Sequence, residues 1–253
     1  MNIPIDPRWL ESTLLASVRM AMFIIIAPPF SSRAFPGMVK AILSVGLGVA
    51  VSGTVEQSLP SLTDAAFYLA LVEQLTIGAA LGFLVYLVFA AIESAGSLID
   101  LFGGFQISQA FDPTLSLNGA AFARLFQMAA VALMFSSGAY QIVLAGLART
   151  FVSLPVGAGF PATITAADVA AELSGMFVAA VQIAGPLIIV LVLADIGLGL
   201  LTKVAPALNA FSMSYPIKMT LSLALGGVVF VALPAAIASM TGAAVALIGG
   251  GHP

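Results

Sequence analysis

The sequence contains very little charge for its length. Only 8% of its 253 residues are charged, against about 25% in a typical soluble protein, and 61% are hydrophobic, against about 45–50%. A soluble fold of this size needs more charged surface to stay hydrated. Water is therefore not the main solvent of this chain.

Other absences exclude whole classes of function. The chain has no cysteine, so it forms no disulfide and no thiolate metal site. Its 8 Lys and Arg residues stand singly, without the basic run typical of nucleic-acid binding. The one histidine, His252, lies in a Gly-Gly-Gly-His-Pro tail, and the sequence lacks the common hydrolase, metalloprotease and phosphate-binding motifs. We expect no enzyme activity, metal, cofactor or nucleic-acid partner.

Long uncharged runs predict an all-α integral membrane protein. A spanning helix needs about 20 apolar residues, and about six helical segments fit the sequence. Asp6 and Glu11 stand where a signal peptide would carry positive charge, so we expect mature sequence at the N-terminus. No internal repeat is visible, which favours a single domain over residues 1–253. One short uncharged run follows Arg19, and the others cover 41–55, 75–92, 125–148, 176–194 and 219–251.

Segments rich in Gly, Pro, Ser, Thr or Asn separate these runs and predict loops. Pro234 predicts a bend in the last run. The distribution of Lys and Arg orients the chain only weakly, because the region around 93–119 has neither. Two explanations stay open. The positive charges are too few for the positive-inside rule to apply, or some helices do not cross the bilayer as independent spans. The predicted loops are 28–37, 56–64, 103–119, 153–167 and 205–216.

Six charged residues lie inside or beside the apolar runs. Each would cost about 2.5–3.5 kcal/mol at the centre of a lipid-facing helix, so we expect them to face protein or water. Glu93, Ser97 and Asp100 share one helical face, which fits a proton or cation path, or bonds that hold neighbouring subunits in register. We favour the second, because a relay needs titratable groups along a path. The six residues are Arg19, Glu73, Glu93, Asp100, Arg124 and Asp195.

Small residues predict close helix packing at two places. Gly78 and Gly82 form a Gly-x-x-x-Gly face, and Gly46 with Gly48 offers a second close-approach surface. The contact could lie within the chain or between chains. The pattern is common in membrane proteins with several spans, so it does not identify a function.

The central segment 103–119 is long and carries no charge except Asp112. It mixes aromatic with small residues. Such a segment at a membrane must be buried in protein or line a cavity, because its backbone amides need partners. An ordinary surface loop with incidental hydrophobic residues is the alternative, and composition alone slightly favours it.

Five blocks, in their order and spacing, resemble the FliR family, whose members also include related subunits of type III secretion. The resemblance covers about residues 18–230. Ala207 stands where the family has Gln, and Tyr140 where many members have His. The blocks are Arg19 with Pro28-Pro29, Phe35-Pro36 and Lys40; Glu73 with Gly78, Gly82, Ala95-Gly96 and Asp100; Asp112-Pro113 with Arg124; Phe151-x-x-Leu154-Pro155-x-Gly157; and Pro206-x-Leu208-Asn209-x-Phe211 with Pro216-x-Lys218.

The resemblance implies a subunit of a flagellar-type protein export gate in the bacterial inner membrane, at the flagellar basal body. With FliP, FliQ and an FlhB-like protein it would form a channel for unfolded export substrates, in contact with membrane lipid. The fold would be a FliP-like portion joined to a FliQ-like C-terminal hairpin, partly standing above the bilayer. Assembly residues would be the six charged residues above with Gly78, Gly82, Pro206, Asn209, Phe211 and Lys218.

By the same resemblance, residues 107–118 would be a plug that closes the channel. Hydrophobic constrictions exclude ions by dewetting, and they reopen without breaking ion pairs. Two alternatives remain: a subunit of a virulence type III system (injectisome), and, less favoured, a small-solute transporter, suggested by the carboxylates and Pro186. Phe105, Ile107 and Phe111 would make the sealing contacts, beside Ser108, Gln109, Asp112 and Pro113.

Overall fold

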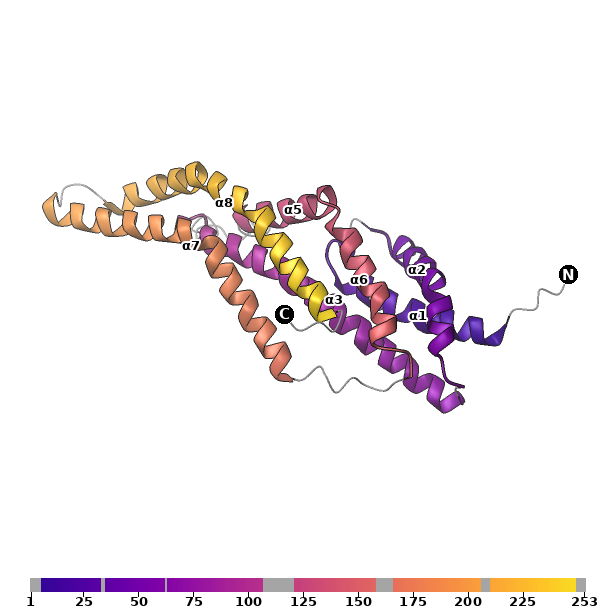
Figure 1. Ribbon diagram of the computed structural model, residues 1–253. Coiled ribbons are helices and arrows are strands. Elements are labelled where there is room, and N and C mark those ends of the chain that lie inside the picture. The colour runs from indigo at the N-terminus through magenta and orange to yellow at the C-terminus, as the bar shows by residue number, and fades with distance from the viewer. Residues whose placement is uncertain are drawn as a thin grey trace. The chain divides into compact units, whose positions relative to one another are not determined.

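The computed structural model describes residues 6–32, 35–61, 63–106, 121–157, 166–205 and 210–248 (Figure 1). Over these residues every regular element is a helix, which confirms the predicted all-α fold class. The helices are α1 (Pro7–Ile26), α2 (Gly37–Ser58), α3 (Asp64–Gly103), α5 (Ala121–Ser136), α6 (Ala139–Ser153), α7 (Ala166–Val204) and α8 (Ala210–Ile248).

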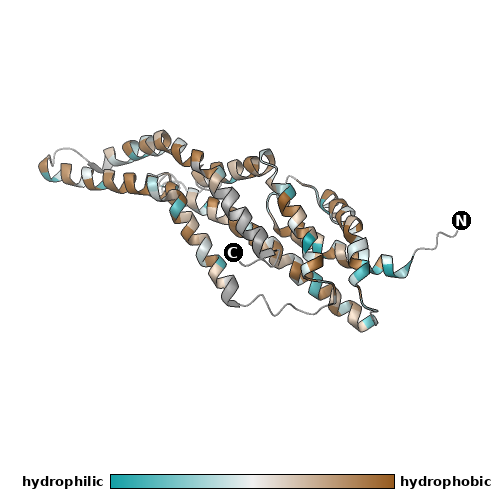
Figure 2. Ribbon diagram, in the orientation of Figure 1, coloured by the Kyte–Doolittle hydropathy of each residue, from teal (hydrophilic) through white to brown (hydrophobic). Residues whose placement is uncertain are grey.

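Within the described residues, five helices are long and apolar enough to cross a membrane. They are α1, α2, α3, Ala170–Val204 of α7 and Met213–Val231 of α8, and the bent pair of α5 and α6 would make a sixth. Hydrophobic residues predominate along these helices in Figure 2. The chain is therefore an all-α integral membrane protein, as its composition predicts.

The chain divides into two compact units. Unit 1 comprises Met1–Val88, Ser137–Glu172 and Met240–Pro253, and so contains α1, α2, the first part of α3, and α6. Unit 2 comprises Phe89–Ser136 and Leu173–Ser239, with the end of α3, α5, and most of α7 and α8. The expected single domain stays a prediction.

In unit 1, α2 buries mainly small residues and exposes large apolar ones. Its buried residues are Ser44, Gly48, Ser52 and Val55, and Gly48 packs on Ser17 of α1. On the same helix Met38 is 76% exposed and Ile42 is 67% exposed. Soluble proteins seldom expose such an apolar face to water, and the pattern fits a helix whose outer face meets lipid or other polypeptides.

Glycines set the distance between α1 and its neighbours. A Cβ atom at Gly78 would overlap the backbone carbonyl of Arg19, and one at Gly82 would press on Phe23 and Ile26. The predicted Gly-x-x-x-Gly face therefore packs within the chain, against α1. Gly48 of α2 packs equally closely on Ser17 of α1, whereas the space around Gly46 is open. The second predicted close-approach surface is therefore confirmed at Gly48 and not at Gly46.

Unit 2 is built around a row of aromatic rings. Phe105, two residues after α3, contacts Phe122 with ring centroids 5.4 Å apart, and Phe122 contacts Phe126 at 6.2 Å. Phe126 continues the row to Phe230 of α8 at 5.1 Å. Gly226 lies against the Phe122 ring, where a side chain would collide. The row joins α3, α5 and α8 into one core.

Two predicted boundaries are wrong. The apolar run 125–148 is not one helix, because Gly138 adopts a left-handed conformation (φ 73°) and starts α6 after α5 has ended. The predicted loop 205–216 is also too long, because α8 begins at Ala210 and includes Pro216. Proline is tolerated inside membrane helices, where backbone groups gain more by staying in a helix than by unfolding.

Candidate functional site

Arg19 is the centre of a buried polar cluster in unit 1. Its side chain is fully buried, as are Gln74 of α3 and Thr150 of α6. Arg19 Nε donates to Gln74 Oε1 at 2.6 Å, and one terminal nitrogen donates to Thr150 Oγ1 at 3.1 Å. The other terminal nitrogen donates to the carbonyl oxygen of Leu154 at 2.8 Å. One guanidinium therefore fixes α1 to both α3 and α6.

Charge and stacking complete this cluster. The Arg19 guanidinium lies 4.1 Å from the centre of the Phe151 ring, a cation–π contact. The buried Glu73 carboxylate interacts electrostatically with Arg19. Leu154 caps the C-terminal end of α6, where the helix dipole favours a cation. The structure thus brings together three of the sequence blocks, those containing Arg19, Glu73 and Phe151.

Asp100 joins two helices of unit 2. Its carboxylate is fully buried and accepts hydrogen bonds from the backbone N–H groups of Phe122 and Ala123, at 3.1 and 3.0 Å. These amides belong to the first turn of α5, where backbone N–H groups have no carbonyl acceptor within the helix. The residue before α5 is Ala120, whose methyl group cannot cap a helix. Asp100 therefore caps α5 from another helix.

The residues on either side of the segment 107–120 lie close together. Phe105 precedes the segment and Phe122 follows it, and their rings touch. Gly104 has a positive φ of 80° and lies against Tyr215 of α8, leaving no room for a side chain. The residues Ile107, Ser108, Gln109, Phe111, Asp112 and Pro113 lie outside the described residues.

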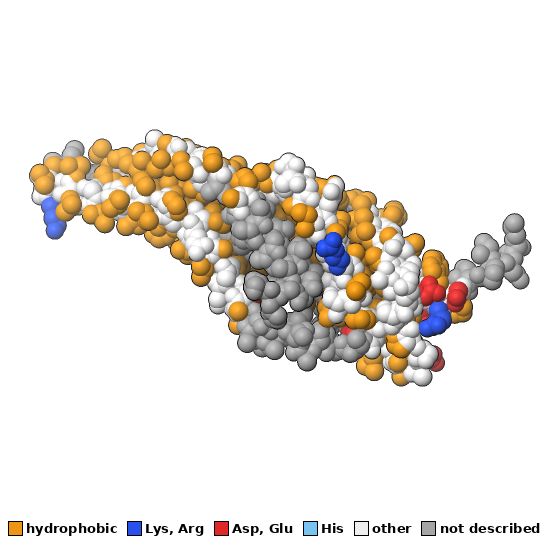
Figure 3. Space-filling model, viewed as in Figure 1, with side chains coloured by type: hydrophobic (Ala, Val, Ile, Leu, Met, Phe, Trp, Pro, Cys, Tyr) orange, Lys and Arg blue, Asp and Glu red, His pale blue; other side chains and the backbone are white. Residues whose placement is uncertain are grey.

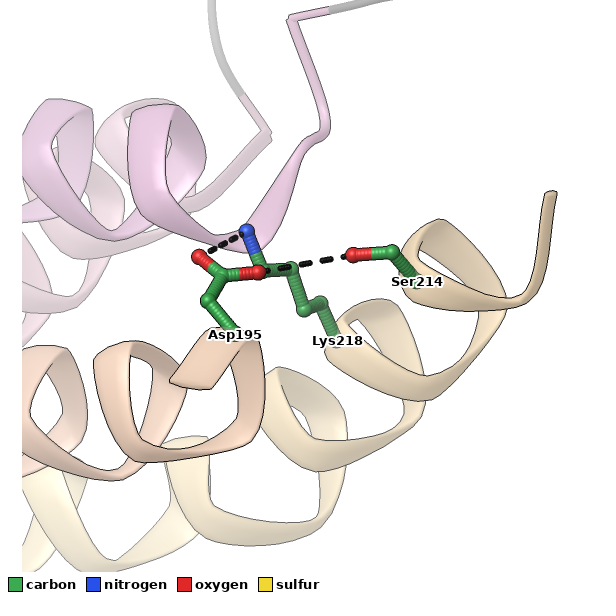
Figure 4. Close-up of polar contacts among 3 residues, drawn as sticks. All are labelled: Asp195, Ser214 and Lys218. Carbon is green, nitrogen blue, oxygen red and sulfur yellow. Dashed lines mark hydrogen bonds and ion pairs between the residues drawn. The ribbon is translucent and has the colours of Figure 1, made fainter. Parts of the chain in front are cut away.

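Asp195 and Lys218 form an ion pair between α7 and α8 (Figure 4). Lys218 Nζ lies 2.6 Å from Asp195 Oδ2, and Ser214 donates a long hydrogen bond of 3.4 Å to Oδ1. The pair links α7 to the start of α8 on either side of residues 206–209. Two predicted assembly residues, far apart in sequence, thus neutralise each other within the chain.

Some predicted residues are not brought together. Glu93 and Arg124 are exposed, whereas Asp100 is buried, so the predicted stripe of Glu93, Ser97 and Asp100 is not one polar network. The two hydrogen bonds of Asp100 described above join α3 to α5 within the chain, and its role in subunit assembly stays a prediction. Pro206 and Asn209 lie outside the described residues, and so does the side chain of Phe211.

Sequence reasoning missed several partners of these charges. Gln74 and Thr150 are ordinary polar residues in apolar helices. Their position in the sequence next to Glu73 and Phe151 was the one feature that could have indicated them as partners of Arg19. Tyr215 was missed as well. Partners across helices depend on tertiary packing, which hydropathy does not encode.

The geometry of these clusters suits holding helices together, not catalysis. Arg19 donates to an amide, a hydroxyl and a carbonyl oxygen, and the Asp100 carboxylate accepts from two backbone amides. Among the described residues, no group of three or more His, Asp or Glu side chains could hold a metal ion. The described clusters are structural joints between helices.

Comparison with known proteins decides the family. Residues 10–244 match the model of the family described as bacterial export proteins, family 1. The chain belongs to this family. It is 32% identical to the flagellar biosynthetic protein FliR of Pectobacterium carotovorum subsp. carotovorum, over 89% of this chain and 87% of the relative. FliR of Escherichia coli (strain K12) is also 32% identical, over 86% and 83%.

The family also reaches beyond flagellar proteins. The Yop proteins translocation protein T of Yersinia pestis is 29% identical over 84% of this chain and 83% of the relative. The predicted resemblance to FliR is therefore confirmed. As a member of the bacterial export proteins, the chain is a membrane-embedded component of an export apparatus.

Proposed function

We propose that this chain is the FliR-type subunit of the flagellar type III export gate in the bacterial inner membrane. With FliP and FliQ it forms the channel through which unfolded flagellar proteins leave the cell, in contact with an FlhB-like protein. The family match over residues 10–244 carries this proposal. The subunit provides helices and a channel wall and catalyses no reaction.

The surface of each unit supports assembly with other subunits. In unit 1, Tyr68, Leu69 and Val72 of α3 are each more than half exposed. In unit 2, Phe177, Leu193 and Val228 are more than half exposed. Hydrophobic side chains also cover much of the face drawn in Figure 3, and charges are few. Such surfaces need lipid or other apolar helices as neighbours. We assign the hairpin of α7 and α8 to the FliQ-like portion and the preceding helices to the FliP-like portion.

Secretion in living cells tests the proposal. The gene is deleted in its own organism, and the amounts of hook and filament proteins in the medium are measured. We expect export to stop without the chain and to return when the full chain is supplied. Export that continues unchanged in the deletion strain would refute the proposed function.

The plug role of residues 107–118 is a finer part of the same proposal. It is supported by the contacts of the residues that flank the segment, through Phe105, Asp100 and the first turn of α5. The segment therefore starts and ends near the same part of unit 2. A segment with no charge except Asp112 can seal a channel by dewetting and yield to a passing chain.

Ion leakage tests the plug. Shortening 107–118 should raise the conductance of membranes that contain the assembled gate, without preventing assembly. Shortening 158–165 by the same number of residues serves as the matched control and should not raise it. If the complex forms and its conductance is unchanged by the first deletion, residues 107–118 are not a plug.

A virulence export system is the second candidate. It is favoured by the similarity to Yop proteins translocation protein T over most of both chains. The same deletion strain distinguishes the two systems. Loss of flagellar proteins from the medium, with virulence proteins still secreted, supports the flagellar assignment, and the opposite pattern supports the virulence system.

A further inference from the structure

Asp195 is an acidic side chain on the apolar surface of α7. Its side chain is 44% exposed, whereas that of its partner Lys218 is only 12% exposed. The large side chains around it on α7 are also exposed and apolar, including Leu193 at 60% and Ile196 at 54%. Contact between this carboxylate and lipid acyl chains would be unfavourable in free energy, because acyl chains offer no hydrogen-bond donors.

The position of Asp195 along the helix also keeps it away from water at the membrane surface. It lies within the candidate span Ala170–Val204, nine residues before the end of that span. At 1.5 Å per residue this is roughly 13 Å along the helix axis. A lysine can extend its long chain over part of such a distance, but the short side chain of aspartate cannot.

The carboxylate retains acceptor capacity in the structure. An ionised carboxylate has about four acceptor sites. Among the described residues, Asp195 receives one short contact from Lys218 and one long hydrogen bond from Ser214. Both donors come from α8 (Figure 4), and the Asp195 side chain is nevertheless 44% exposed. The carboxylate can therefore accept a further hydrogen bond from a donor outside the chain.

The backbone next to Asp195 allows another helix to come close. Gly199 lies one turn further along the same face of α7, and it is exposed. A Cβ atom there, or at Gly197, would meet nothing within 4 Å. Small residues at such a face let two helix backbones approach, which brings a short side chain within hydrogen-bond distance of a neighbour.

We propose that the α7 face carrying Asp195 and Gly199 docks a helix of another subunit of the export gate. A donor side chain on that helix, such as arginine, lysine, asparagine or serine, binds the exposed side of the Asp195 carboxylate. Complementarity between this acceptor and the donor identifies the partner as protein, because acyl chains have no donor. The inference rests on the proposed function and names the chemistry of one of its contacts.

Photo-crosslinking identifies what covers this face. A benzoylphenylalanine is placed at Val192, one turn before Asp195, in cells that produce the complete export apparatus. We expect an ultraviolet-dependent adduct with another export-gate subunit, identified by mass spectrometry. An adduct with a second copy of this chain, or labelling of lipid alone, would overturn the proposal.

Paired substitutions separate docking from the ion pair within the chain. If Asp195 serves Lys218 alone, the double variant Asp195→Leu/Lys218→Met leaves no unpaired charge and should assemble normally. The proposal instead expects this double variant to retain about tenfold fewer partner subunits on purification, because the donor on the partner loses its acceptor. Asp195→Asn, which keeps an acceptor oxygen, should retain more partner than Asp195→Leu.

A matched control comes from the same helix. Lys203→Met removes an exposed charge near the end of the span and should leave co-purification unchanged. If the double variant assembles and exports like the wild type, Asp195 docks no partner, and the proposed function stands. If the wild-type chain itself supports no export, the proposed function fails instead.

Discussion

Single buried charges determine how the helices of this protein join. Arg19 uses three separate nitrogens on three acceptors from two helices, and its planar group stacks on Phe151. Lysine offers a single compact ammonium and cannot reproduce this fork. Arg19 therefore acts as a joint that only arginine can make.

Replacing Arg19 should destabilise unit 1 strongly. Arg19→Met leaves the buried Glu73 without its cation and should lower the free energy of unfolding by about 3–5 kcal/mol. Arg19→Lys keeps a charge but loses at least one hydrogen bond, so its free energy of unfolding should lie between those of Arg19→Met and the wild type. Thermal unfolding of the purified complex measures both, and the double variant Arg19→Met/Glu73→Gln should recover part of the loss. Equal stability of all variants would contradict the assigned joint.

Asp100 gives a local prediction for the start of α5. Asp100→Ala removes the acceptor for two backbone amides, and loss of such a cap costs about 0.5–2 kcal/mol. Hydrogen exchange at Phe122 and Ala123 should become faster. Asp100→Asn retains one acceptor oxygen and should protect these amides more than Asp100→Ala. Unchanged exchange in the alanine variant would show that the cap does not stabilise α5.

Helices in this chain pack closely at glycine residues. The positions where helices start and end are set by single residues, and the hydropathy of the sequence does not reveal them. The apolar runs predicted the existence and type of nearly every helix, since burial of backbone groups in an apolar solvent requires helices. The break at Gly138 was missed because the flanking residues remain apolar. Continuation of α8 through Pro216 was missed because proline usually ends a helix in water.

The same limits apply to the candidate site. Arg19, Glu73, Asp100 and Asp195 could be selected from the sequence, because a charge within an apolar run needs a partner, and Lys218 could be selected from the family resemblance. Their partners could not, because Gln74, Thr150 and the amides of α5 are brought near them only by packing. Glu93 shows the limit of helical spacing, since it shares a predicted face with Asp100 and is nevertheless exposed.

Two glycines of unit 1 provide a matched test of helix packing. Gly78→Ala forces a methyl group into the backbone of α1, so we expect lower thermal stability and less folded protein in the membrane. Gly46→Ala enters open space and adds helix propensity, worth up to about 1 kcal/mol. It should be neutral or stabilising. A Gly78→Ala variant as stable as Gly46→Ala would mean that α1 and α3 are not in close contact there.

At the scale of the whole molecule, large apolar side chains are exposed on both units, and several polar side chains are buried together with the apolar core. In unit 1 the buried polar residues include Ser17, Arg19, Ser52, Gln74 and Thr150. A protein of this kind, in a family of export proteins, is one part of a larger membrane assembly, and its exposed helices are completed by neighbours. We therefore expect this chain to be stable in a complex with its partner subunits and unstable when produced alone.

Native mass spectrometry of the chain purified from membranes in mild detergent tests this claim most directly. We predict that, when FliP and FliQ are produced together with it, the chain is found in one discrete complex that contains both. Produced alone, it should aggregate or be degraded. A chain that is monomeric, folded and stable by itself, and that remains alone when FliP and FliQ are present, would contradict the account.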